Sequence, residues 1–182
     1  VYLLAFASAV VTANAYYIHP IISRVATSLD VSTALVGIVP ALNQIALALG
    51  VLLLLPLGDR VNNRSLVAVC LSIQVIMLAI MATVSDFWTF TVASTVLGFF
   101  TITPYLLPAY ASKRVEPQRS GFVTALLASG VIAGVQLSRL TSGVLAETIS
   151  WQAVYWLAAG MMSISAVALP MLMTETGRSA PS

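Results

Sequence analysis

The stretch ALALGVLLLLPLGDRVNNRSLVAVC, residues 46–70, decides the fold. It consists of two apolar runs separated by a short polar connection, which holds Asp59, Arg60 and Arg64. A helix on the surface of a soluble protein would carry charges along one whole face. Charges confined to the connection between two apolar runs are instead typical of a hairpin of membrane-spanning helices.

The composition extends this interpretation to the whole chain. Of its 182 residues, 59% are apolar and 8% are charged, and the formal net charge is +2. The charged share is about a third of that of an ordinary soluble domain. This excludes a water-soluble globule and predicts an integral membrane protein with several spans and no separate soluble domain.

Division of the chain at its charges and turn-forming residues predicts six spans. They cover residues 2–22, 34–57, 66–84, 87–111, 122–146 and 153–173. Each is close to the ~20 residues that a transmembrane helix needs, whereas the strands of a membrane β-barrel are shorter and alternate in polarity. We therefore expect an all-α membrane protein whose six-helix bundle occupies residues 1–173, with residues 174–182 as a linker or tail.

The connections differ in charge, which predicts the orientation. Bases gather in the second and fourth connections and in the tail, namely Arg60, Arg64, Lys113, Arg114, Arg119 and Arg178. The other connections hold one base beside three acids, namely Arg24, Asp30, Asp86 and Glu147. The positive-inside rule then places both chain ends in the cytoplasm. Because the bases form no single tract, nucleic-acid binding is not supported.

Four polar side chains inside the spans are candidates for a substrate path, because polar groups in lipid are costly and face partners or watery cavities. Arg139 lies about 10 Å from the outer end of its span at ~1.5 Å per residue, and Gln136 shares its helix face. Asn14 and Gln44 fall near the middle of the first two spans. The alternatives are an arginine that snorkels to the headgroups and amides that bind neighbouring helices.

The connection Pro56-Leu-Gly-Asp-Arg-Val-Asn-Asn-Arg64 resembles the signature loop of the major facilitator superfamily. Asp59, Arg60 and Arg64 match its pattern, whereas Asn62 and Asn63 depart from it, as does the leucine at position 55. Three further segments are similar to the same family. Residues 116–121, with Arg119, resemble its second cytoplasmic loop, and residues 151–156 resemble the start of its sixth helix. Residues 139–143 are similar to the fifth helix of bacterial sugar-efflux and multidrug-efflux members.

The resemblance implies the first half of a twelve-helix transporter of the bacterial inner membrane, built from two inverted three-helix repeats. Its substrate would be a small drug- or sugar-like solute, exported in exchange for protons by alternating access between the two halves. Asp59, Arg60 and Arg64 would then form a cytoplasmic gate. The arginine that the family carries in its fourth helix is replaced here by Ser94.

Two other classes of function compete with this interpretation. An intramembrane enzyme is disfavoured because the chain has no Gly-x-Ser-Gly segment, no His-Glu-x-x-His metal motif and a single histidine. We expect no cofactor and no metal site. The second alternative is a complete six-helix protein that acts as a homodimer, or a partial chain that is inactive by itself. Partners would be the solute, protons, lipid and either a C-terminal half or a second copy.

Overall fold

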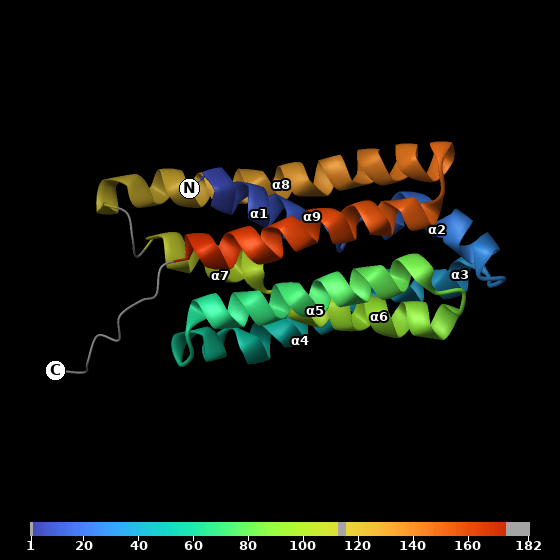
Figure 1. Cartoon of the computed structure of the whole chain (residues 1–182), viewed down its shortest axis with the longest axis horizontal. Coiled ribbons are helices and arrows are strands. Elements are labelled where there is room, and N and C mark those ends of the chain that lie inside the picture. The colour runs from blue at the N-terminus through green and yellow to red at the C-terminus, as the bar shows by residue number, and fades with distance from the viewer. Residues whose placement is uncertain (1, 113–115, 174–182) are drawn as a thin grey trace.

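A computed structural model describes residues 2–112 and 116–173 of the chain, and this part consists of helices and their connections (Figure 1). The elements are α1 (Tyr2–Ala13), α2 (Ile18–Ser28), α3 (Thr33–Val36), α4 (Ile38–Leu54), the 3-10 helix η1 (Pro56–Asp59), α5 (Asn63–Thr83), α6 (Phe87–Phe100), α7 (Thr103–Ser112), α8 (Pro117–Thr148) and α9 (Trp151–Leu172). The long helices run nearly parallel. The predicted all-α membrane fold is confirmed.

Five segments of the described residues are long and apolar enough to cross a membrane: Thr33–Gly58, Asn63–Thr83, Phe87–Pro108, Gln118–Thr148 and Trp151–Met171. They correspond to the second to sixth predicted spans. The first predicted span is continuous to residue 22, but the structure divides it into α1 and α2 and extends it to Ser28. Each of these two helices is too short to cross a bilayer alone.

Prolines explain where the spans are divided. A proline has no N–H to donate and is tolerated only in the first turn of a helix without disturbing the hydrogen bonds. Pro20 is the third residue of α2, Pro104 is the second of α7, and Pro40 is the third of α4. The preceding helix therefore stops a few residues earlier, which divides the first and fourth spans near their middle and separates the single turn α3 from α4 in the second.

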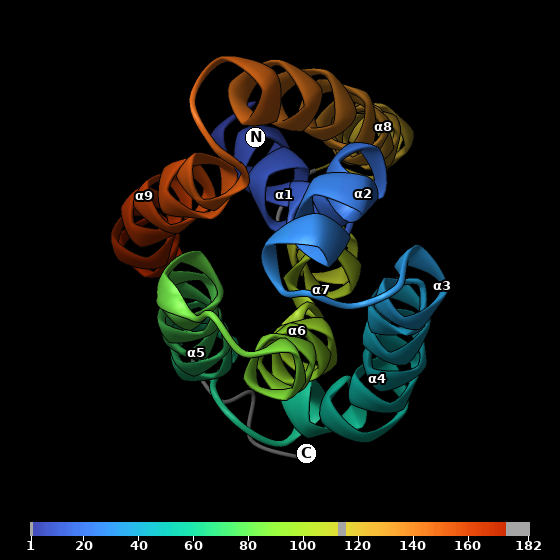
Figure 2. The same cartoon turned by 90° about the vertical axis from the view of Figure 1, so that its right-hand side faces the viewer.

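The strongest packing joins each helix of the first three spans to a helix of the last three. The most extensive contacts join α5 to α9, α1 to α8 and α4 to α6. In the end-on view, α5 and α9 lie together on one side, the two divided spans occupy the centre, and α8 and α4 lie at opposite edges (Figure 2). Each divided span thus packs against the edge helix of the other three-helix repeat, and the two repeats interlock in the same way.

Glycine permits the close approach of each edge helix to its divided span. A Cβ atom at Gly134 of α8 would collide with the backbone of Ala9 in α1. A Cβ atom at Gly50 of α4 would collide with the backbone of Phe99 in α6. Small residues at such crossings allow the backbone contact that drives association of helices in lipid. Both repeats therefore use the same packing device.

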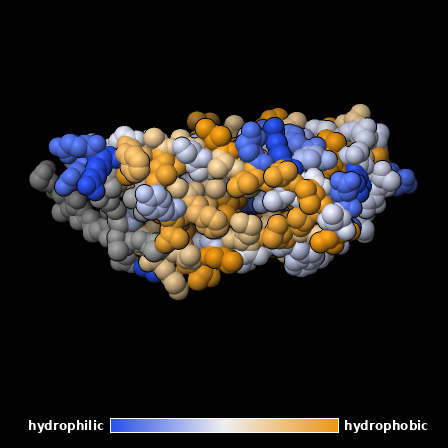
Figure 3. Space-filling model, turned by 90° about the horizontal axis from the view of Figure 1, so that it is seen from above, coloured by the Kyte–Doolittle hydropathy of each residue, from blue (hydrophilic) through white to orange (hydrophobic). Residues whose placement is uncertain are grey.

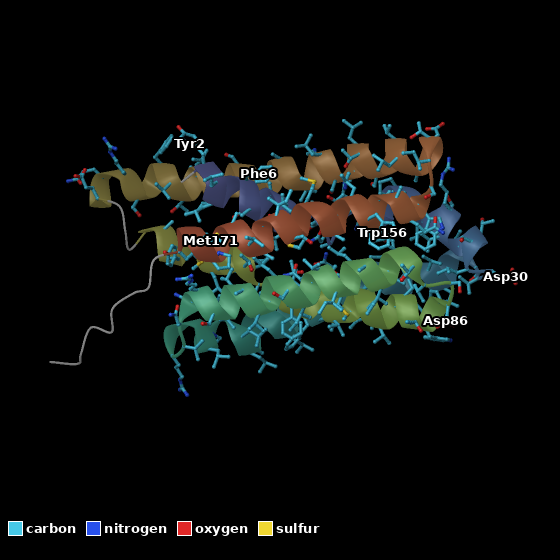
Figure 4. All side chains as sticks on the ribbon, viewed as in Figure 1. Tyr2, Phe6, Asp30, Asp86, Trp156 and Met171 are labelled. Atoms are coloured by element: carbon cyan, nitrogen blue, oxygen red, sulfur yellow. The ribbon has the colours of Figure 1, made fainter. Side chains whose placement is uncertain are left out.

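The bundle separates the acidic connections from the basic ones. Asp30 and Asp86 lie at the same end of the molecule (Figure 4), whereas η1 and the start of α8 lie at the other end (Figure 1). Lys113, Arg114 and Arg178 fall outside the described residues. The arrangement has the charge asymmetry that the predicted orientation requires, and the side on which each end lies stays a prediction.

The outer surface is apolar along much of its length. Tyr2 and Met171 are 74% and 73% exposed, and Phe6 and Trp156 are both 53% exposed. These four side chains lie on the outside of α1 and α9 (Figure 4). The view from above shows apolar surface over much of the molecule, interrupted by hydrophilic patches (Figure 3). Exposed apolar area of this extent indicates contact with lipid.

Candidate functional site

Three of the predicted polar side chains lie at nearly the same depth in the bundle. Arg139 precedes the end of α8 at Thr148 by about 14 Å at ~1.5 Å per residue, and Gln136 is one turn deeper. Gln44 lies about 16 Å from the start of α3, which is at the same end of the bundle. Half of a hydrocarbon core of ~30 Å is about 15 Å. All three therefore lie well inside their spans.

The helices that carry these side chains, α8 and α4, border the open face of the bundle, by which we mean the side away from α5 and α9, where α2 and α7 lie between α8 and α4 (Figure 2). Gln136 and Arg139 are exposed on α8, and Gln44 is exposed on α4. At ~100° per residue, Gln44 is about 100° from the exposed apolar stripe that includes Ile45 and Leu49. The polar and lipid-facing sides of α4 are therefore distinct.

Arg139 contacts the break in the first span. Its guanidinium carbon lies 5.8 Å from the centre of the Tyr16 ring, in cation–π geometry. The Tyr16 ring lies 5.8 Å from that of His19, which is close enough to Arg139 for the two to interact electrostatically. Among the described residues, no carboxylate forms a salt bridge with Arg139. We call Tyr16, Gln44, Gln136 and Arg139 the midspan belt.

Asn14, the remaining predicted candidate, is not exposed on the open face. It lies in the break between α1 and α2 and is 5% exposed. Neither its Nδ2 nor its Oδ1 has a hydrogen-bond partner among the described residues. An amide with no partner in the fold is costly, so its place beside a helix break makes it available for a ligand or for a rearranged backbone.

A side-chain bridge at the break between α6 and α7 involves Gln74 and Thr101, which were not among the predicted site residues. Pro104 cannot donate to the carbonyl of Phe100, which lies four residues earlier. Gln74 of α5 replaces this bond, since its Nε2 donates to the Phe100 oxygen at 3.0 Å. The Thr101 hydroxyl donates to Gln74 Oε1 at 3.3 Å. In the sequence, a glutamine in the middle of the third span and a proline in the middle of the fourth are the signal from which this bridge could have been predicted.

A second buried amide joins α4 to α6. Asn43 Nδ2 donates to the backbone oxygen of Ser94 at 2.7 Å and to its hydroxyl at 3.3 Å. Gly98, one turn further along α6, packs against Asn43. Ser94 stands where the resembling family carries an arginine, so the second and fourth spans are joined here by neutral groups. The cation well inside the spans of this chain comes from the fifth span.

The proposed gate segment forms a compact turn between α4 and α5. Gly58 allows η1 to approach α7, because a Cβ atom there would lie 2.9 Å from Leu106 Cδ2. Asn62 caps α5, since its side chain accepts a hydrogen bond from the N–H of Arg64 at 2.9 Å. Arg60 and Arg64 are exposed, and so is Arg119 in the first turn of α8.

The side chain of Asp59 lies outside the described part of the structure, and its pairing in the gate stays a prediction. At this end of the bundle, the described residues include three exposed arginines, Arg60, Arg64 and Arg119. Such groups are suited to contacts with acidic side chains or with anionic lipid headgroups.

The sequence is similar, over nearly its whole length, to a transporter family and to proteins that carry the name transporter. The family profile of the Major Facilitator Superfamily matches residues 4–182. The Uncharacterized transporter YgaY of Escherichia coli O157:H7 is 27% identical over 178 residues, which cover 96% of this chain and 45% of the relative. The Probable transporter SCO4007 of Streptomyces coelicolor is 27% identical over 166 residues, which cover 91% of this chain and 39% of the relative. The chain thus spans less than half the length of these relatives.

Proposed function

The chain belongs to the Major Facilitator Superfamily, and on this premise we propose that it forms one half of a transporter that exports a small organic solute in exchange for protons. The same proposal places the protein in a bacterial inner membrane with both ends in the cytoplasm, because the basic connections lie at one end of the bundle. Transport would proceed by alternating access of a midplane site to the two sides of the membrane.

The observation that carries the proposal is the midspan belt on the open face. Polar side chains at the midplane are expensive in lipid and mark the path of a substrate. Here they border a face whose two central spans are both broken by prolines. Interrupted helices in corresponding positions of two repeats are the best indicator of a transporter's binding site.

An open face needs a second half to enclose the solute. This half is either further sequence of the same polypeptide or a second copy of the chain. Determination of the mass of the protein in its native membranes separates these arrangements. A mass near twice the 19.2 kDa of this chain supports a single two-half polypeptide, and a mass of 19.2 kDa with a cross-linked dimer supports two copies.

For the gate, we propose that Asp59, Arg60 and Arg64, with Arg119 nearby, hold the cytoplasmic side closed while the outer side is open. The contacts of this segment would form and break once in each cycle. Replacement of Asp59 by asparagine should therefore lower the transport rate while the affinity for the solute stays unchanged. A loss of affinity with an unchanged maximal rate would contradict this role.

The test of function is transport by the native protein in proteoliposomes with an imposed proton gradient. A panel of radiolabelled drug-like and sugar-like solutes is added, and solute flux and the fluorescence of a trapped pH indicator are recorded together. We expect one solute class to move against the proton flow. Arg139→Ala should reduce this flux without lowering the amount of protein in the membrane, whereas Arg24→Ala, near the outer end of α2, is the matched control.

Two results would contradict the proposal. If no solute moves while the protein is folded and correctly inserted, the chain is not part of a transporter of these solutes. If solute moves without any proton movement, transport stands but the proton exchange is wrong. A parallel loss of flux and of protein abundance in Arg139→Ala would assign Arg139 to the structure of the bundle and not to the solute path.

A further inference from the structure

We propose that the solute carried at the midspan belt is an organic anion, with a carboxylate that binds Arg139 and an apolar body that lies beside Tyr16. This inference rests on the proposed transport function and gives the chemical class of its substrate. It follows from the charges, the exposure and the neighbours of Arg139.

Arg139 is a cation well inside its span, and among the described residues no carboxylate pairs with it. The six acidic residues of the sequence are Asp30, Asp59, Asp86, Glu116, Glu147 and Glu175, and all of them fall near span ends or in connections. Glu147 shares α8 with Arg139 but lies about 12 Å further along the helix axis. Ionised side chains inside a membrane require a partner or water. An anion that pairs with Arg139 would therefore come from outside the described bundle, and the solute is the source that we propose.

The contact with Tyr16 leaves the guanidinium free to bind that anion. The guanidinium carbon lies 5.8 Å from the ring centre, and this cation–π contact gives the five N–H donors no lone-pair acceptor. No hydrogen bond of these donors to a described residue occurs, and the side chain is exposed. A planar fork of unused donors matches a carboxylate, which it binds through two parallel hydrogen bonds.

The surroundings of Arg139 favour a solute with an apolar body. Ile132 lies on the same face of α8, two turns away, and is 65% exposed. Gln136 lies between them and can donate to a neutral polar group of the solute. The Tyr16 ring adds an apolar surface at the edge of α2. A small inorganic anion would leave these side chains unused.

A carboxylate of the second half is the competing source of the anion. In that case Arg139 would be neutralised before the solute arrives, and the charge of the solute would not affect its binding. Comparison of solutes that share a carbon skeleton but differ in charge separates the two sources.

The experiment measures equilibrium binding to the native protein in lipid nanodiscs. Two matched sets of radiolabelled compounds serve as probes: benzoate, benzamide and benzylamine, and hexanoate, hexanamide and hexylamine. We expect a carboxylate to bind at least about ten-fold more tightly than its amide, and the amine to bind most weakly. Arg139→Gln should remove the preference, whereas Arg139→Lys should keep part of it.

Arg24→Gln is the control, because it removes one positive charge from the exposed surface of α2 near its outer end. It should leave the preference unchanged. The inference is overturned if an amide or amine binds as tightly as its carboxylate, if no carboxylate binds, or if Arg139→Gln keeps the preference. Transport of a neutral solute with no binding of carboxylates would contradict the anionic substrate class but support the transport function. Binding of carboxylates without transport of any solute would support the anion site but contradict the transport function.

Discussion

The two three-helix repeats contain the same device and differ in how they stabilise it. In both, the first span is broken before a proline, at residues 14–17 and 101–102, and an edge helix packs on it through glycine. The break between α6 and α7 has its freed carbonyl bonded by Gln74. The break between α1 and α2 contains Asn14, whose amide has no partner among the described residues.

This difference separates a structural break from a functional one. The second break costs less in lipid because its freed carbonyl, on Phe100, has a donor, although the buried Thr103 hydroxyl beside it has no partner among the described residues. An unsatisfied break is less stable and gains free energy when a ligand or a new backbone arrangement supplies the missing bonds. The unsatisfied break is also the one that Arg139 contacts through Tyr16. We therefore expect the first repeat to change during transport and the second to act as a support.

The largest expected effects concern the feature that the repeats share. Gly134→Ala and Gly50→Ala should each destabilise the bundle by about 1–3 kcal/mol, because the new methyl group would collide with backbone atoms. Gly160→Ala is the control, since a Cβ atom there meets nothing within 4 Å. The measurement is reversible unfolding in detergent. Equal stability of all three variants would show that the glycine crossings are not tight.

The next effect concerns the anion that we propose to bind beside the break between α1 and α2. If the solute is an anion that leaves the cytoplasm, an interior-negative potential should accelerate its export, since moving one charge across 100 mV is worth about 2.3 kcal/mol. Flux in proteoliposomes clamped with valinomycin at several potassium gradients tests this. A rate independent of potential would indicate that the transported charge is compensated.

A pair of substitutions tests the difference itself. Gln74→Leu should destabilise the protein by about 1 kcal/mol, because it leaves the Phe100 carbonyl without a donor. Asn14→Leu should leave stability unchanged or raise it, since it removes a buried amide that bonds to no described residue, and it should lower the transport rate. Unfolding and flux are measured for both. If Asn14→Leu destabilised the protein and Gln74→Leu did not, the two interruptions would not differ in the way proposed.

The smallest effect concerns the start of α6. The carboxylate of Asp86 accepts a hydrogen bond from the N–H of Thr89 at 2.7 Å, and this bond lowers the pKa of Asp86 from 3.8. Because the folded pKa is the lower one, its stabilisation is fully present above pH 3.8 and is lost as the pH falls through the folded value. Asp86→Ser keeps a cap without this titration. A difference in unfolding temperature that does not vary with pH would contradict the assignment.

Much of the fold could be read from the order of residues. The lengths of the apolar runs predicted the helices, and the membrane family suggested by Asp59, Arg60 and Arg64 is confirmed by the match over residues 4–182. The first break was missed, although Asn14 and Pro20 in one span were signals for it. A helix pattern is read over many residues, so a break of four residues with apolar neighbours leaves the hydropathy of the span unchanged.

The candidate site was only partly predictable for a different reason. Polarity at mid-span singled out Arg139, Gln136 and Gln44, because a polar group in lipid is costly wherever the helix packs. Tyr16 carries no such signal, since a tyrosine suits a core, an interface or a site equally well. Its role depends on α2 lying beside α8.

By itself, the sequence determined that this is a helical membrane protein with charged ends and a cation in its interior, because burial in lipid imposes a cost that each residue carries independently of its neighbours. Only the tertiary structure decided which polar groups find partners. Gln74 is bonded and Asn14 is not, and this distinction arises from which helix lies opposite each amide. Hydrogen bonds and ring contacts are pairwise and act over a few ångströms, so they exist only once the packing has brought distant segments together.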